Sequence, residues 1–305
     1  MKRFWMVLAL TGAVAGCQRE PGSAVLTKGR LVVECDEAVW PAMQKEAEEF
    51  RRQYQESEIT VRAVEAREAT ANFVNDSVRV IVCGRKLNEE ETGALKSSKT
   101  EFQEYLVARS AVAVIMHGEN RLDQVRMGQL DSLFSGVTTR WSHLRGRPVV
   151  DLVVGGIDCS TNEVFRAQVL KGRTLALSAT RMKSSAELIL HVQNSRAAIG
   201  IVSPAWLKGA DAGVNVPAVG SPEWRPDTLG LPGQYYTPAQ AYVFLGYYPV
   251  VANVYIYSRE IDRNISLGFI AFVMSGPGQK IIQESGLVPA QVPVRIVQLT
   301  SGQVR

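Results

Sequence analysis

The sequence lacks several features that would point directly to a function. It has no clustered run of basic residues, and 34 lysines and arginines against 30 acidic residues leave a net charge of only +4. A nucleic-acid-binding face is therefore not expected. The 25 glycines and 13 prolines are ordinary for 305 residues, which excludes collagen-like and low-complexity classes. No internal repeat is evident, and a hydrophobic fraction of 46% excludes disorder over most of the length.

Long hydrophobic runs are also missing beyond the N-terminus, so no transmembrane helix of roughly 18 or more apolar residues is expected. At the N-terminus itself, Lys2 and Arg3 precede an apolar stretch from Phe4 to Val14. This order is typical of a secretory signal peptide. The run Val14-Ala15-Gly16-Cys17 resembles a bacterial lipobox, in which the cysteine becomes lipidated and is the first mature residue.

The resemblance implies a signal segment over residues 1–17, with Cys17 as the lipidated residue, although a plain signal peptide followed by a chance cysteine is the alternative. Residues 18–28 are polar, contain Pro and Gly, and are predicted to form a flexible tether. We therefore expect a periplasmic protein that a lipid anchor holds to a membrane, with the inner or outer membrane left open. Three cysteines remain in that oxidising compartment, where a disulfide is allowed, and an odd number leaves at least one unpaired within the chain.

Predicted strands and helices alternate in the first part of the chain. They are a strand at 31–35, a helix with apolar residues at 39, 43, 47 and 50, strands at 59–64 and 78–82, and a helix that starts from a capping box at Asn88. This alternation predicts an α/β fold with an open parallel sheet. Ligands bind beyond the carboxyl ends of such strands, which are here the loops 34–37, 65–68 and 83–85.

Further elements are predicted in the second part. The strands are one long strand from Tyr105 to Met116 and shorter strands at 149–154, 198–202 and 250–257. The helices are one at 127–134, one that opens with a capping box at Ser160–Glu163, one that opens with a second box at Ser184–Glu187, and two around Gly276-Pro277-Gly278. Residues 208–240 are predicted to form an extended surface segment.

A series of short segments gives the clearest indication of a family. They are RKLNEEE at 85–91, FSG at 134–136 followed by Trp141, AIGIVS at 198–203, YP at 248–249, SGPGQ at 275–279 and GLVP at 286–289. In this order and spacing they resemble the PstS-like phosphate-binding proteins of ABC transporters, over about residues 30–290. The sequence is most similar to a lipoprotein branch in which Asp-Glu follows the first strand, as Asp36-Glu37 does.

The resemblance implies a two-lobed, type II periplasmic-binding-protein (Venus-flytrap) fold with doubly wound sheets, which closes on its ligand by a hinge motion. By similarity, lobe one comprises residues 28–105 plus 250–305, and lobe two comprises 106–249. The chain would cross between the lobes near 105–107 and 247–249.

Four loops surround the anion in phosphate-binding members and supply hydroxyls, helix N-terminal N–H groups and an arginine. The corresponding positions of this sequence are Cys35, Asp36 and Glu37 in the first loop, Arg67 and Glu68 in the second, Gly84 and Arg85 in the third, and Cys159, Ser160, Thr161 and Asn162 in the fourth. The arginine of the family falls on Gly155, so Arg85 or Arg67 would have to replace it.

Acidic residues make these loops unusual for a phosphate site. Six carboxylates stand against two arginines, and a dianion close to carboxylates is strongly disfavoured; the six are Glu34, Asp36, Glu37, Glu65, Glu68 and Asp158. Two interpretations stay open. Either several acids point outward or pair with Arg67 and Arg85, or the ligand is a cation, a zwitterion or a metal.

All three remaining cysteines fall at predicted strand ends beside the cleft. Strands one and three are neighbours in the usual doubly wound order, so Cys35 and Cys83 could lie within disulfide reach. Soft-metal binding by Cys35, Cys83 and Cys159 is an alternative. The plainest interpretation is that they are small buried residues.

Three functions compete. The first is a lipid-anchored receptor that captures a small solute, phosphate by resemblance, for an ABC permease. The second is a sensor or protein-interaction module with a degenerate cleft. The third is an enzyme that uses Cys159 as a thiolate, but none of the 3 histidines that could serve as base (His117, His143, His191) lies in a catalytic motif. We therefore expect no enzyme, no cofactor, no resident metal and no nucleic-acid partner.

Overall fold

The computed structural model describes residues 26–140, 150–156, 158–208, 213–220, 233–260 and 262–291. The strands are β1 (Gly29–Asp36), β2 (Ser57–Val64), β3 (Val80–Cys83), β4 (Gln103–Ala111), β5 (Ala113–His117), β6 (Gln124–Arg126), β7 (Asp151–Val154), β8 (Thr180–Arg181), β9 (Ala198–Val202), β10 (Val214–Asn215), β11 (Ala218–Gly220), β12 (Tyr235–Tyr236), β13 (Val251–Ser258) and β14 (Val288–Pro289). The helices are α2 (Trp40–Gln53), α3 (Ala66–Val74), α4 (Glu89–Ser97), α5 (Met127–Phe134), α6 (Ser160–Gln168), α7 (Ser185–Asn194), α8 (Gln240–Phe244), α9 (Ile265–Met274) and α10 (Gly276–Glu284), with 3-10 turns η1 (Glu37–Val39) and η2 (Pro204–Trp206).

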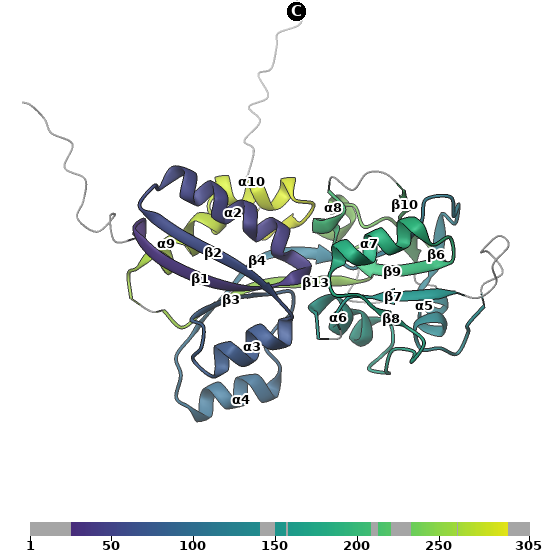
Figure 1. Ribbon diagram of the computed structural model, residues 1–305, viewed down its shortest axis with the longest axis horizontal. Helices are drawn as coiled ribbons and strands as arrows, with labels where there is room; N and C mark the ends of the chain where they lie inside the picture. Colours follow the sequence, from purple (N-terminus) through teal and green to yellow (C-terminus); the bar gives the residue numbers. More distant parts are fainter. Residues whose placement is uncertain are drawn as a thin grey trace, which may run out of the picture.

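Two large sheets organise the molecule and lie side by side along its long axis (Figure 1). One has six strands in the order β14-β4-β13-β3-β1-β2, and the other has five in the order β10-β5-β9-β7-β8. The six-stranded sheet is mixed, because β2, β1 and β3 pair in parallel while β13, β4 and β14 pair antiparallel. The predicted α/β class is confirmed, and the parallel order holds for the first three strands.

Helices cover both faces of each sheet (Figure 1). Helices α2, α9 and α10 lie on one face of the six-stranded sheet, and α3 and α4 lie on the other. The five-stranded sheet has α7 on one face and α5 and α6 on the other. The carboxyl ends of β1 and β3 therefore point toward the second sheet, which is where a ligand site is expected.

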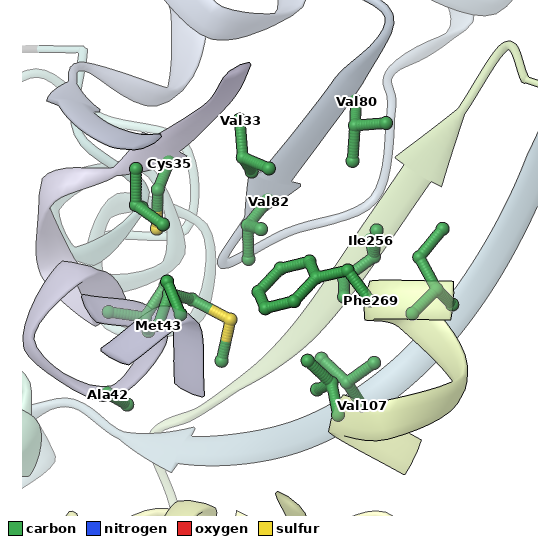
Figure 2. Packing of buried hydrophobic residues seen from close by; sticks show 14 of the residues in the cluster. Val33, Cys35, Ala42, Met43, Val80, Val82, Val107, Ile256 and Phe269 are labelled. Atoms are coloured by element: carbon green, nitrogen blue, oxygen red, sulfur yellow. The ribbon is translucent and has the colours of Figure 1, made fainter. Parts of the chain in front are cut away.

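The predicted apolar stripe of α2 forms part of the core. Met43, Ala47 and Phe50 are buried, and Phe50 packs edge-on against Phe269 of α9. Pro41 lies in the first turn of α2, where its missing N–H breaks no helical hydrogen bond. Figure 2 shows this layer from close by.

The chain passes between the two sheets at Val112 and Val250. A single strand was expected from Tyr105 to Met116, and that prediction was wrong, because β4 pairs with β13 whereas β5 pairs with β9 of the other sheet. The backbone N–H of Val112 donates to the carbonyl of Val250 (2.9 Å), and the hydroxyl of Tyr248 donates to the carbonyl of Val112 (2.8 Å). The expected first crossing at 105–107 thus falls inside β4.

Two of the three predicted capping boxes differ from the structure. At α4 both reciprocal bonds are present between Asn88 and Glu91, as predicted. At α6 the cap residue is Cys159 rather than Ser160, which is already the first helical residue. At α7 the hydroxyl of Ser184 accepts from the N–H of Glu187, but the Glu187 carboxylate accepts from Lys183 instead. Free hydroxyls and carboxylates near a helix start have several possible partners, which the spacing alone does not distinguish.

Three other segments differ from the elements predicted for them. Asp36 and Glu37 are not loop residues but the last residue of β1 and the first of η1. The segment Gly276-Pro277-Gly278 opens α10 rather than separating two helices. The segment expected over 208–240 contains the short strands β10, β11 and β12, with 209–212 and 221–232 outside the described residues, as are residues 1–25, Trp141 and His143.

Among the described residues, no single helix is long and apolar enough to cross a bilayer. Helices α9 and α10 reach that length and composition only as a pair bent by 64°. Both contribute buried side chains to the core, including Phe269 and Ile282.

Candidate functional site

The candidate site lies where the carboxyl ends of β1 and β3 face the first turns of α6 and α7. The parallel register of β1 and β3 pairs Cys35 with Val82, so that Asp36 and Gly84 follow at the same edge of the sheet. From the other sheet, β7 leads into Ser160 at the start of α6. Loops 34–37 and 83–85 therefore meet as predicted, and the start of α6 lies opposite them.

Asp36 is the centre of the site. Its side chain is fully buried; Oδ1 accepts from the N–H of Ala38 (3.3 Å) and Oδ2 from the N–H of Gly84 (3.1 Å). The hydroxyl and backbone N–H of Ser160 supply further hydrogen bonds. Burial raises the pKa of this carboxyl, and these hydrogen bonds counteract part of the rise. The donors thus surround one carboxylate from both sides of the cleft.

Glycines allow the two sides to approach this closely. A Cβ added at Gly84 would lie 2.2 Å from the Ser160 hydroxyl oxygen and 3.0 Å from Asp36 Oδ2. A Cβ added at Gly156 would lie 1.8 Å from Oε1 of Glu65. Since real Cβ atoms do not come this close to other atoms, both positions require glycine in the observed arrangement.

Glu37, like Asp36, accepts hydrogen bonds from the other side of the cleft, here from the first residue of α7. Its Oε1 accepts from the backbone N–H of Ser185 (2.8 Å), and its Oε2 accepts from the hydroxyl of Ser185 (2.7 Å). Burial raises the pKa of Glu37, while its hydrogen bonds to Ser185 lower it. The first turn of a helix exposes unpaired N–H groups and the positive end of the dipole, so a carboxylate is favoured there.

Two tryptophans extend this contact across the cleft. The indole Nε1 of Trp206 donates to the backbone carbonyl of Glu37 (2.9 Å). The rings of Trp206 and Trp40 are stacked, with centroids 6.1 Å apart and planes at 24°. The sequence analysis singled out neither Trp206 nor Ser185. The Ser184-Ser185 pair before an apolar helix was the available signal for Ser185.

Arg85 and Arg67 already have acidic partners. Arg85 makes two bonds to the Glu91 carboxylate, each 2.8 Å, and an ion pair with Glu163 of α6. Burial opposes its charge, but Glu91 and Glu163 together raise the pKa of Arg85. Arg67 is exposed and lies 3.6 Å from Asp158. Both arginines therefore bridge the cleft to acids of the second side.

The first of the two open interpretations is confirmed for two of the six acids, because Asp158 pairs with Arg67 and Glu68 is exposed, but not for the others. Asp36 and Glu37 point into the cleft, as described. Glu65 accepts from the N–H of Asp158 (3.3 Å), and Glu34 accepts from the side-chain amide of Asn72 (2.9 Å). Glu68 lies at an exposed position in the first turn of α3.

The rest of the predicted fourth loop forms the first turn of α6. Ser160, Thr161 and Asn162 are buried, and the Asn162 amide donates to the carbonyls of Gly155 (3.2 Å) and Gly156 (2.7 Å). These bonds hold the loop before α6 against the helix. Gly155 therefore lies next to the helix start, at the position that carries arginine in the resembled family.

The three described cysteines are free and buried. Cys35 packs with Val33, Val82 and Met43 on the α2 face of the sheet (Figure 2), whereas Cys83 packs on the α3 face. Because Cys35 is opposite Val82 in the register, the next residue, Cys83, points to the other face. A Cys35–Cys83 disulfide is therefore not formed, although their strands are neighbours as expected.

The metal and thiolate alternatives gain no support from the geometry. Within the described ranges, no group of three or more His, Cys, Asp or Glu side chains is arranged to hold a metal ion. Burial raises the pKa of the Cys159 thiol, which disfavours a thiolate. His191 bonds to Asp151 (2.6 Å), and Nδ1 of His117 accepts from the N–H of Glu119 (3.1 Å), so both make these contacts away from Cys159.

A groove of about 870 Å³ lies on the six-stranded side, around the start of β1. Its lining includes Lys28, Arg30 and Arg79, which form ion pairs with Glu56, Glu58 and Glu260 respectively. Since it is at the amino end of β1, it is distinct from the cleft at the carboxyl ends.

Comparisons with known proteins agree with this architecture. The sequence model of the PBP superfamily domain matches residues 22–277. SphX of Synechococcus elongatus is 22% identical over 293 residues, covering 93% of this chain and 84% of SphX. The structure is similar to a putative phosphate ABC transporter substrate-binding protein with bound phosphate from Clostridium perfringens, with a TM-score of 0.71, 20% identity, and coverage of 86% of this chain and 100% of that one. An ABC-type phosphate transport receptor from Vibrio cholerae gives a TM-score of 0.64 at 17% identity, with the same coverage. The predicted two-lobed, type II fold and the predicted resemblance are confirmed.

Proposed function

Because the chain belongs to the PBP superfamily, we propose that it is a lipid-anchored extracytoplasmic receptor for a small oxyanion, with inorganic phosphate as the first candidate. One observation supports this most directly: N–H and hydroxyl donors of Gly84 and Ser160 converge on the carboxylate of Asp36. Donors arranged around one oxyanion are suited to another, and the start of α6 adds the positive end of a helix dipole. The names of the similar proteins, phosphate receptors among them, agree with this choice.

The proposal includes a hinged closure of two lobes. The sequence places lobe one at 28–105 plus 250–305 and lobe two at 106–249; because β4 belongs to the six-stranded sheet, we place the first boundary at Val112 instead, with the second at Val250. Rotation about these two connections would move Ser160 and Ser185 away from β1 and expose their donors to solvent. The closed cleft would then be the form presented to an ABC permease.

The proposed ligand site keeps the set inferred from the sequence. It comprises Cys35, Asp36, Glu37, Arg67, Glu68, Gly84, Arg85, Cys159, Ser160, Thr161 and Asn162. Within this set Gly84 and the first turn of α6 would supply the donors, while Asp36 and Glu37 would have to turn aside. Residues 1–17, with Cys17 as the lipidated residue, and the tether at 18–28 would attach the protein to a membrane.

Thermal unfolding tests the ligand. The full chain carrying Cys17→Ser is unfolded in phosphate-free buffer and again with millimolar phosphate or sulfate. A ligand at 100 times its Kd stabilises by about 2.7 kcal/mol, which gives a readable rise in Tm for a chain of this size. A saturable rise with phosphate but not sulfate supports the receptor. The absence of any rise removes phosphate as the ligand.

A sensor or interaction module is the second candidate, because a specific observation favours it. The two sides of the cleft are joined directly, because the N–H and the hydroxyl of Ser185 donate to the Glu37 carboxylate. A protein that closes on itself can present a closed surface to a protein partner at all times. Unchanged Tm with phosphate, together with a compact shape in solution, would favour this candidate.

A further inference from the structure

Two carboxyl side chains from the end of β1 and the start of η1 lie at the N-terminal ends of helices that pack on the five-stranded sheet. Asp36 lies at the first turn of α6, and Glu37 lies at the first turn of α7. Each carboxylate accepts both a backbone N–H and a hydroxyl from the helix that faces it. A charged acceptor at a helix start combines a charge-assisted hydrogen bond with the dipole.

Other contacts across the cleft reinforce the same closed arrangement. They are the Trp206 bond to the Glu37 carbonyl, the Trp40–Trp206 stack, the Arg85–Glu163 ion pair, the Glu65 bond to the Asp158 N–H, and the Arg67 N–H bond to the Asp158 carbonyl at 3.2 Å. Asp36 and Glu37 differ from these because they bond to the N–H groups that begin α6 and α7. These groups are the donors best suited to an external anion.

We propose that Asp36 and Glu37 are internal ligands of the cleft, which hold the lobes closed without a solute, and that an external oxyanion binds only by displacing them. This inference rests on the proposed function, since it concerns the same cleft. It assigns to the two acids the role of weakening anion affinity, rather than of contacting the anion.

Competition for the same donors is the physical reason. An N–H group makes one strong hydrogen bond, so Gly84 and Ser185 cannot fully serve both a carboxylate and a phosphate oxygen. A phosphate beside the two carboxylates would also be repelled in a site that is poorly screened by water. Because the carboxylates belong to the chain, they compete as intramolecular ligands at a constant effective concentration.

The experiment removes the two internal carboxylates together. Asp36→Ser with Glu37→Ser is made in the full chain carrying Cys17→Ser, and small-angle X-ray scattering gives the radius of gyration without phosphate. A compact chain of this length has a radius of about 19 Å. We expect the parent to keep its compact radius with and without phosphate, and the double variant to have a larger radius without phosphate.

A matched control removes two acids that do not face the cleft. Glu56→Ser with Glu58→Ser takes away the same charge from exposed side chains that pair with Lys28 and Arg30. This control should keep the radius of the parent. Titration calorimetry with inorganic phosphate should then give a Kd at least about tenfold lower for the cleft double variant than for the parent, because repulsion and competition are both removed.

The outcomes separate this inference from the proposed function. An enlarged radius in the cleft variant alone supports the internal ligands, even if no variant binds phosphate and the receptor proposal fails. An unchanged radius overturns the inference, even if the parent binds phosphate. A parent that is open and contracts on adding phosphate overturns it as well.

A gentler variant covers the case in which the double variant does not fold. Glu37→Gln keeps the size of the side chain and its oxygen acceptor but removes the charge at the start of α7. We expect tighter phosphate binding than in the parent, by a smaller factor than in the double variant. Binding no tighter than the parent's would overturn the inference.

Discussion

Two fully buried carboxyl groups, Asp36 and Glu46, lie ten positions apart in the chain and differ in whether they accept hydrogen bonds. Asp36 accepts hydrogen bonds from Ala38, Gly84 and Ser160 at the cleft. Glu46 lies on the buried face of α2, and both of its oxygens are without a hydrogen-bond partner among the described residues. Burial raises the pKa of Glu46 to about 9, with a smaller contribution from Glu49.

The difference shows that burial alone does not decide whether an acid keeps its charge. Removing a carboxylate from water is costly in both places, but only Asp36 regains hydrogen bonds in return. At Asp36 these hydrogen bonds offset part of the rise in pKa that burial causes, whereas Glu46 has no such bonds and is held in its protonated form at neutral pH. Sequence patterning separates these cases poorly, because each acid has both acidic and apolar residues within three positions of it.

The largest expected effect concerns Glu46 and pH. The folded state keeps the Glu46 proton up to a pKa of about 9, while the unfolded chain releases it near the ordinary glutamate pKa of 4.5. The stability from this proton is therefore complete below pH 4.5 and is lost as pH rises toward 9. Between pH 5 and pH 8 the loss should be about 4 kcal/mol, from about 1.36 kcal/mol per pH unit.

Urea unfolding at pH 5 and pH 8 measures this loss in the parent and in Glu46→Gln. The variant should lack this part of the pH dependence and should be more stable than the parent at pH 8. Glu48→Gln is the matched control, since Glu48 is exposed on the same helix and should leave the difference between the two pH values unchanged. Equal pH dependence in parent and Glu46→Gln would contradict the contrast between the two acids.

A smaller effect is expected at Gly84, on the Asp36 side of the comparison. Gly84→Ala would place a Cβ 2.2 Å from the Ser160 hydroxyl oxygen, so the closed cleft must loosen. Overpacking of this kind costs about 1–3 kcal/mol in denaturant unfolding. The variant should also have a larger radius of gyration than the parent.

Gly93→Ala is the control for that substitution. Gly93 lies within α4, and among the described residues nothing is within 4 Å of an added Cβ. Alanine should stabilise there by about 1 kcal/mol, because it is a better helix former than glycine. A Gly84→Ala protein as stable and compact as the parent would show that the two sides of the cleft are not this close in solution.

The smallest expected effect concerns two tryptophan hydrogen bonds. That of Trp206 crosses the cleft, whereas that of Trp40 stays within the six-stranded side. Trp206→Phe loses the Nε1 donor to the Glu37 carbonyl, and Trp40→Phe loses the Nε1 donor to the Val61 carbonyl at 3.1 Å. Each should cost about 1 kcal/mol of stability by urea unfolding. Only Trp206→Phe should enlarge the radius of gyration, and equal radii in the two variants would argue against Trp206 as part of the closure.

Much of the fold could be predicted from local pattern. The alternating strands and helices, the capping box at Asn88 and the helix at 127–134 depend on residues close together in the chain. The strand expected from Tyr105 to Met116 failed because its apolar run continues through Val112, where the chain changes partner strands. Hydrophobicity is the same on both sides of that residue, and only the pairing differs.

The position of the candidate site could be predicted from the sequence, but the contacts of its side chains could not. The carboxyl-end loops were correctly expected to meet, because parallel strands end at one edge of a sheet. Which side chains interact at that edge was harder to predict. Whether Cys35 and Cys83 could form a disulfide depended on a one-residue offset in register, which places their side chains on opposite faces of the sheet.

The sequence by itself determined the elements, their order and the loops in which Asp36, Gly84 and Ser160 lie, because periodicity and capping act over a few residues. Only the tertiary structure decided which donors meet which carboxylates. Glu37 and Ser185 are 148 residues apart, and their contact exists only because two sheets approach each other. Glu46 belongs to the same apolar layer as its neighbours, yet packing leaves its oxygens without donors among the described residues. The state of a buried charge is set by its neighbours in space, and these are chosen by the packing of distant segments.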